Sequence, residues 1–171
     1  MKRVLMFGWV MSLGVFTFSC GAQEQSGSKA TVTKPVAVEA AAPVWLTSLE
    51  AAKTEAAKRK VPILADFTGS DWCGWCIRLD KEVFSTPVFR DYAGTNLVLL
   101  VVDFPRSKAQ TDELKKQNEE LSTRFGIEGF PTVLILNTEG KETARTGYRE
   151  GGAEAYVAHL KNLIGGKSAT K

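Results

Sequence analysis

In Ile63-Leu64-Ala65-Asp66-Phe67-Thr68-Gly69-Ser70-Asp71-Trp72-Cys73-Gly74-Trp75-Cys76, a short apolar run leads through a polar turn to two cysteines spaced C-x-x-C. If Cys73 lies at the start of a helix, unpaired backbone N–H groups and the helix dipole favour its thiolate, which is the form that attacks disulfides. Cys76 then falls on the same side of that helix. There it can attack Cys73 once a mixed disulfide has formed. The pattern therefore predicts thiol redox chemistry.

Other uses of a C-x-x-C pair fit this chain less well. A tetrahedral zinc site needs two more Cys or His ligands, and only Cys20 and His159 remain besides the pair. Covalent haem attachment needs a His directly after the second cysteine, where Ile77 stands. A passive structural disulfide stays open as an alternative, although so short a loop gains little stability from cross-linking. We expect no metal and no organic cofactor.

The N-terminal segment, residues 1–19, has the composition of an export signal. Two basic residues precede an apolar block without acidic residues. The block is shorter than the roughly 18 residues of a comfortable membrane span. Ser19-Cys20 at its end resembles a bacterial lipoprotein signal, which predicts lipidation of Cys20, with ordinary cleavage after Ala22 as the alternative. Residues 20–43 are mostly small and polar, which is typical of a flexible tether.

The charge balance excludes one class of partner. Residues 1–19 hold two of the 22 Lys and Arg side chains and none of the 19 Asp and Glu side chains, so the rest of the chain is nearly neutral. A nearly neutral chain lacks the excess positive charge that neutralises phosphates. We therefore expect no nucleic-acid partner.

The spacing of apolar residues predicts one domain over residues 44–166, followed by a disordered tail at 167–171. Helical periodicity indicates helices at about 46–59, 76–84, 112–125 and 152–164, with a break at Pro87. Apolar runs indicate strands at 63–67 and 97–102, and a hairpin joins 132–136 to 142–146. This order predicts a mixed sheet with helices on both faces. It puts Cys73 beyond the carboxyl end of a strand, a favoured position for a functional site.

Several motifs together resemble the thioredoxin superfamily over about residues 45–165. They are Asp66-Phe67, Trp72-Cys73-Gly74-Trp75-Cys76, Gly126-Ile127-Glu128-Gly129-Phe130-Pro131-Thr132 and Gly147. The segment from Lys60 to Cys73 looks similar to the exported bacterial branch, akin to the thiol-reducing domains of disulfide interchange proteins. The resemblance implies an α/β thioredoxin fold, with a central mixed four-stranded sheet flanked by helices and preceded by an N-terminal helix.

The resemblance also implies roles for individual residues. Cys73 is the nucleophile, Cys76 is the resolving thiol, and a buried carboxylate at Asp66 relays the proton of Cys76. A cis peptide at Pro131 faces the cysteines, and Phe130 offers its backbone to an extended substrate. The expected substrate-binding residues are Trp72, Gly74, Trp75, Phe130 and Pro131.

Two features depart from the family pattern. Six residues separate Asp66 from Cys73, where thioredoxins proper have five, so it stays open whether the carboxylate points at Cys76. Trp75 stands where thioredoxins carry Pro and isomerases carry His, so the redox poise cannot be copied from either relative. Three alternatives remain: Asp66 as a structural carboxyl, the two tryptophans as packing residues, and Pro131 as a simple turn.

These observations lead us to expect an exported, lipid-anchored thiol-disulfide oxidoreductase on the periplasmic side of a bacterial envelope, acting as a monomer on protein substrates. A reductant outside the cytoplasm needs a membrane electron donor, because that compartment has no comparable thiol pool. The alternatives are an oxidase or isomerase of the same fold, and a non-catalytic binding module with an inert disulfide.

Overall fold

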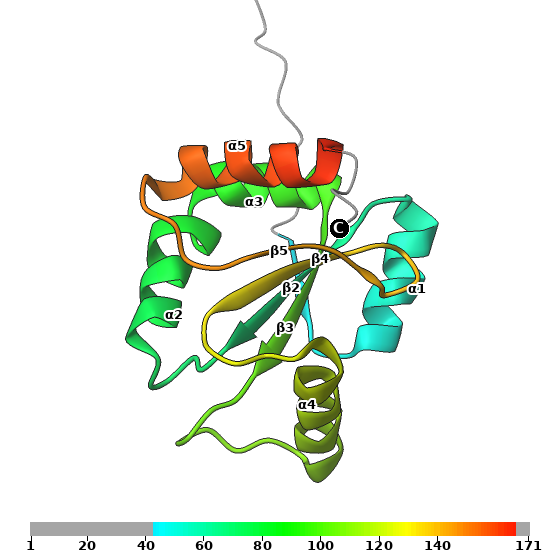
Figure 1. Cartoon of the computed structure of the whole chain (residues 1–171), viewed down its shortest axis with the longest axis vertical. Coiled ribbons are helices and arrows are strands. Elements are labelled where there is room, and N and C mark those ends of the chain that lie inside the picture. Colours follow the sequence, from blue (N-terminus) through cyan, green and yellow to red (C-terminus); the bar gives the residue numbers. More distant parts are fainter. Residues whose placement is uncertain (1–42, 167–171) are drawn as a thin grey trace, which may run out of the picture. The chain divides into compact units, whose positions relative to one another are not determined.

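The computed structural model describes residues 43–166. The expected signal peptide, Cys20, nearly all of the tether and the C-terminal tail lie outside these residues. Helices cover both faces of a central sheet (Figure 1). In chain order the elements are β1 (Trp45–Leu46), α1 (Leu49–Arg59), β2 (Ile63–Thr68), α2 (Gly74–Leu79), the π-helical turn η1 (Asp80–Phe84), α3 (Pro87–Asn96), β3 (Val98–Asp103), α4 (Asp112–Phe125), β4 (Thr132–Leu136), β5 (Glu142–Thr146) and α5 (Gly152–Gly165).

The sheet is mixed, as the order of predicted elements implied. Its strands lie in the order β1-β3-β2-β4-β5. β1, β3 and β2 run parallel, whereas β4 is antiparallel to β2 and β5 is antiparallel to β4. Every residue of β2 is buried, which is why this strand reads as a continuous apolar run. Asp66 lies in this strand, between Val101 of β3 and Val133 of β4.

The sheet carries one strand more than the four expected, because β1 pairs with β3. Ser48 caps α1, its Oγ accepting the N–H of Ala51 at 3.3 Å, so the helix begins at Leu49 and the expected start at 46 was wrong. Trp45 stands at helical spacing before Leu49, yet it packs on Phe84 with ring centroids 5.2 Å apart. A strand of two residues is too short for periodicity to reveal it.

Buried side chains form one cluster on each face of the sheet. On one face, α2, η1, α3 and α5 pack on the strands, and Phe89 and Tyr156 are its largest buried side chains. On the other face α1 and α4 pack around Phe67. Figure 1 shows α3 and α5 side by side. Because both faces of the sheet are covered, the loops beyond the carboxyl end of β2 are the favoured position for a functional site.

Two predicted helix boundaries are confirmed. α3 begins at Pro87 after Thr86, whose Oγ1 accepts the N–H of Phe89 at 3.3 Å. α4 ends at Gly126, which has φ +57°, a left-handed conformation that favours glycine. The chain leaves this cap toward Pro131, so the end of α4 sets where the loop before β4 begins.

Candidate active site

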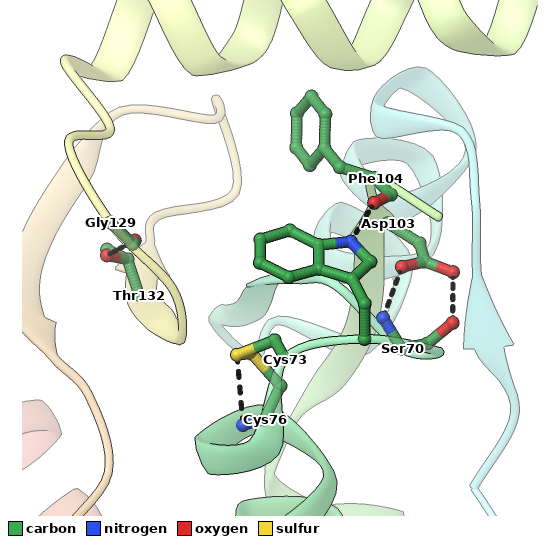
Figure 2. Close-up of a disulfide and its surroundings, with 8 residues drawn as sticks. Ser70, Cys73, Cys76, Asp103, Phe104, Gly129 and Thr132 are labelled. Atoms are coloured by element: carbon green, nitrogen blue, oxygen red, sulfur yellow. Dashed lines mark hydrogen bonds between the residues drawn. A yellow bond between two sulfur atoms is a disulfide. The ribbon is translucent and has the colours of Figure 1, made fainter. Parts of the chain in front are cut away.

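The two cysteines lie at the start of α2, just beyond the end of β2. The backbone N–H of Cys73 donates to Gly69 O at 2.9 Å, which turns the chain into the helix. Cys73 is the N-cap residue and forms a disulfide with Cys76. The backbone N–H of Cys76 also donates to Cys73 Sγ at 3.2 Å (Figure 2). In the reduced protein the same N–H can stabilise a thiolate on Cys73.

Trp72 and Trp75 directly precede Cys73 and Cys76 in the sequence, and we call their two side chains the rim of the disulfide. Trp72 forms one side of it. Its indole N–H donates to Phe104 O at 2.7 Å, and its ring meets the edge of Phe130 at a centroid distance of 5.9 Å. Phe104 also packs on Phe130, at 5.2 Å. A Cβ at Gly69 would approach the indole to 2.5 Å, so glycine is required beneath this ring. Trp72 is therefore held by residues from three loops.

The loop before β4 carries Pro131, and the Phe130–Pro131 peptide bond is cis, as the resemblance implied. Thr132 Oγ1 donates to Gly129 O at 2.7 Å and closes this loop (Figure 2). A Cβ at Gly147 would lie 3.0 Å from Pro131 O, so glycine allows this close approach. The contact between Phe130 and Trp72 brings the loop to the rim of the disulfide.

Trp75 forms the other side of the rim and is 55% exposed. Its ring packs on Tyr148 at a centroid distance of 5.1 Å, and the Arg78 guanidinium lies over both rings, at 5.5 and 5.2 Å. Glu82 ties this group together, because it accepts hydrogen bonds from Arg78 Nε at 2.7 Å and from the Tyr148 hydroxyl at 2.8 Å. A large apolar surface is thus held open beside the disulfide.

Asp66 and Cys76 line the same cavity, which has a volume of about 320 Å³. Asp66 is 7% exposed, and its Oδ1 has no hydrogen-bond partner within residues 43–166. Burial raises the pKa of this carboxyl to about 8, and the charges of Asp80 and Asp103 add to the effect. Despite its longer spacing from Cys73, Asp66 therefore shares a cavity with the second cysteine.

The structure also locates His159 and bears on metal binding and membrane crossing within residues 43–166. His159 Nε2 lies 3.0 Å from Thr146 Oγ1, and no catalytic partner contacts it there. Residues 43–166 contain no group of three or more His, Cys, Asp or Glu side chains that could hold a metal ion. In the same residues, no helix is long and apolar enough to cross a membrane.

The family follows from comparison with known proteins. A model of the thioredoxin-like domain family matches residues 49–164. The chain belongs to the thioredoxin-like family. It is 36% identical over 146 residues to the disulfide bond reductase DsbH of Chlamydia pneumoniae, a match that covers 85% of this chain and 86% of the relative. The solved structure of DsbH oxidoreductase covers 82% of this chain and 95% of that chain, with a TM-score of 0.71 at 36% identity.

Two longer proteins match a smaller part of this thioredoxin-like chain. The thioredoxin-related protein DsbJ of Chlamydia pneumoniae is 30% identical over 104 residues, which cover 61% of this chain and 30% of DsbJ. The thiol:disulfide interchange protein DsbD of Klebsiella pneumoniae is 35% identical over 105 residues, which cover 59% of this chain and 16% of DsbD. With the Cys73–Cys76 disulfide, these similarities make the thioredoxin-like chain a thiol-disulfide oxidoreductase.

The structure adds residues to this thioredoxin-like site that the sequence did not indicate. The predicted residues are connected to the disulfide in three ways. Gly74 and Trp75 lie between the two cysteines at the start of α2, and Asp66 lines a cavity with Cys76. Phe130, which precedes Pro131, contacts Trp72. Tyr148 and Arg78 join the site through Trp75, and Phe104 joins it through Trp72. One sequence pattern could have indicated the contact between Arg78 and Glu82, namely their i, i+4 spacing on a helix. That spacing is common on solvent-exposed helix faces, so it does not identify a functional site.

Proposed function

We propose that this enzyme is an exported reductant of disulfides in proteins. Two features together support the proposal. The Cys73–Cys76 pair lies at the start of α2, just beyond the carboxyl end of β2, and the chain is 36% identical to a disulfide bond reductase over 86% of that relative's length. A reductant releases two electrons to its substrate in each cycle and must be re-reduced by a separate donor.

In the proposed cycle, the Cys73 thiolate attacks one sulfur of a substrate disulfide and expels the other as a thiolate. Cys76 then gives its proton to the Asp66 carboxylate and attacks Cys73 Sγ, which breaks the mixed disulfide. Both substrate sulfurs leave as thiolates, which take up protons from solvent, and Asp66 releases its proton to solvent. The enzyme is left as a disulfide, so two electrons have passed to the substrate. The cavity shared by Asp66 and Cys76 supports this proton transfer, because the carboxyl pKa of about 8 lies near that of an ordinary thiol.

For substrate binding, we propose that an extended segment lies across the rim between the two tryptophans. The space beside Gly74 is open to such a segment, because a Cβ at this position would meet no atom within 4 Å. The segment's backbone pairs with the backbone of Phe130, next to Pro131. Trp72 and Trp75 supply apolar contact on either side, which is supported by their fixed positions and by the exposure of Trp75.

Export and anchoring belong to the same proposal. Residues 1–19 act as a signal peptide, Cys20 carries the lipid, and residues 20–43 hold the domain away from the membrane. A membrane donor on the periplasmic side re-reduces the disulfide. Mass spectrometry of the membrane-extracted protein tests the anchor: acyl chains on Cys20 are expected. An unmodified N-terminus at Gln23 contradicts it.

The reduction potential of the Cys73–Cys76 pair tests the direction of electron flow. The full chain is equilibrated in glutathione buffers, and alkylated thiols are counted by mass. A value near about −270 mV is expected for a reductant, whereas a value above about −200 mV indicates an oxidase or isomerase. A pair that resists reduction below about −300 mV indicates a structural disulfide in a binding module.

Two cysteine variants test the roles of the sulfurs. Cys73→Ser should abolish disulfide exchange, because the attacking thiolate is lost. Cys76→Ser should accumulate mixed disulfides with substrates, because attack remains and resolution is lost. Exchange by Cys73→Ser at the parental rate contradicts the assignment of the nucleophile.

A further inference from the structure

Two residues in the turn before the first cysteine are bound to the last residue of β3 and to the residue that follows it. The N–H of Ser70 donates to Asp103 Oδ1 at 2.9 Å and its hydroxyl to Oδ2 at 2.6 Å (Figure 2). Trp72 donates to Phe104 O, as described above. We call residues 104–108 the β3–α4 segment. These bonds fix the start of this segment against the rim of the disulfide.

Asp71 fixes the rest of the β3–α4 segment. Its carboxylate accepts the backbone N–H groups of Arg106, Ser107 and Lys108, at 3.0, 2.6 and 3.2 Å. These bonds, the one from Arg106 first, lower the pKa of Asp71, so the carboxylate is charged at neutral pH. Because all three donors are backbone groups, they persist when the side chain of Arg106 is changed. The carboxylate of Asp71 is thus engaged by the backbone rather than by the guanidinium.

The side chain of Arg106 reaches back over the active-site rim. Its guanidinium carbon lies over the Trp72 ring, 3.9 Å from the ring centroid, which is a close cation–π contact. Arg106 is exposed, and its side chain forms no hydrogen bond or ion pair within residues 43–166. A guanidinium has five N–H donors, and the contact with the ring does not use them as hydrogen-bond donors to the described residues. The donors are therefore available to a ligand.

This combination occurs at one arginine in the described part of the chain. Arg78 lies over Trp75, but Glu82 already neutralises it at 2.7 Å. Three other arginines donate to backbone carbonyls: Arg59, Arg124 and Arg145. Among the arginines of residues 43–166, only Arg106 combines contact with a tryptophan of the C-x-x-C motif and unpaired donors. Trp72 therefore carries an available cation over its ring, whereas the cation over the Trp75 ring is paired with Glu82.

We infer that Arg106 is a specificity-determining residue that binds an Asp or Glu side chain beside the target disulfide of a polypeptide substrate. A carboxylate matches the planar, two-donor edge of a guanidinium. The contact would hold the substrate against Trp72, next to Cys73, and raise the rate of attack mainly through faster association. This inference rests on the proposed action on protein disulfides. It specifies that disulfides beside an acidic side chain react fastest.

Matched peptides test the inference. Three disulfide-containing peptides differ at one position beside a cysteine, which is Asp, Asn or Lys. The second-order rate constant of each peptide with the pre-reduced full chain is measured at low and at high salt. We expect the Asp peptide to react about threefold to fivefold faster than the Asn peptide at low salt, with the preference shrinking at high salt.

Variants separate the side chain from the net charge. Arg106→Gln should bring the Asp and Asn rates to equality, and Arg106→Glu should make the Lys peptide the fastest. Arg90→Gln, at an exposed position on α3, removes the same charge elsewhere and should keep the preference. Equal rates in the parent protein, or equal effects of Arg106→Gln and Arg90→Gln, would overturn the inference. Failure of the parent protein to react with any peptide would instead contradict the proposed function itself.

Discussion

Asp66 is an ionisable residue in β2, the strand in which every residue is buried. Its Oδ1 has no partner within the described residues, and its pKa is about 8 because burial disfavours the carboxylate. In the unfolded chain an Asp side chain ionises near pH 3.9. Between about pH 4 and pH 8 the folded protein therefore holds a proton that the unfolded chain releases, so stability falls as the pH rises through this range.

Asp66→Asn should remove this pH dependence. At about 1.4 kcal/mol for each pH unit, the free energy of unfolding of the oxidised parent protein should fall by roughly 3 kcal/mol, relative to the variant, between pH 5 and pH 7.5. Urea unfolding of both proteins at the two pH values measures the difference. Asp91→Asn, at an exposed position on α3, serves as the control and should follow the parent curve. Parallel curves for the parent and Asp66→Asn would contradict the raised pKa.

The same substitution should slow the resolving step, because Cys76 loses the carboxylate that we propose as the acceptor of its proton. The release of reduced substrate from a preformed mixed disulfide at Cys73 is the appropriate measurement. We expect the parent rate to rise with pH through about pH 8 and the Asp66→Asn rate to lack that step. Identical pH profiles would assign Asp66 a purely structural role.

At the scale of single elements, the end of α4 determines how the chain enters the loop with the cis proline. Gly126 donates to Thr123 O at 3.2 Å and Ile127 donates to Ser122 O at 2.9 Å, so that carbonyls of the last turn are paired. Gly126 has φ +57°, and a Cβ there would meet no atom within 4 Å. The need for glycine is therefore conformational rather than steric.

Two glycine substitutions should change the free energy of unfolding in opposite directions. Gly126→Ala should destabilise the protein by about 1 kcal/mol, because alanine is strained in the left-handed region. Gly94 lies inside α3, where a Cβ would also meet nothing within 4 Å, and Gly94→Ala should stabilise by about 0.5–1 kcal/mol. Denaturant unfolding of both variants measures the two shifts. A stabilising Gly126→Ala would contradict the capping role.

At the scale of the whole molecule, the sheet separates two clusters of buried side chains. Leu160 of α5 is fully buried on one face, and Leu121 of α4 is 6% exposed on the other. The two side chains belong to different clusters and are separated by the strands. Both clusters nevertheless stabilise the same strands, so the domain should unfold as one unit.

Leu160→Ala and Leu121→Ala should each destabilise the domain by roughly 2–4 kcal/mol, through lost burial and the cavity that remains. Because the sites share no partners, the double variant should show the sum to within about 0.5 kcal/mol. Urea unfolding followed by tryptophan fluorescence and by circular dichroism measures both effects. Transitions that separate between the two probes would show that the two faces unfold independently.

Local patterns were sufficient for most of the elements. The buried strand at 63–67, the break at Pro87, the cap at Gly126 and the hairpin all follow from spacing or turn residues, which act within a few positions of the chain. β1 did not follow from such a pattern. Its two residues become a strand only because Leu99 and Leu100 lie beside them.

The sequence by itself determined the chemistry: a C-x-x-C pair at the junction of a buried strand and a helix, with a carboxyl in that strand. The tertiary structure alone decided what surrounds the pair. Asp66 shares a cavity with Cys76, Tyr148 packs on Trp75, and the Arg106 guanidinium lies over the Trp72 ring. Most of these contacts join residues from distant parts of the chain. Sequence periodicity indicates only which residues share a face of one helix or strand, so it cannot predict contacts between distant parts of the chain.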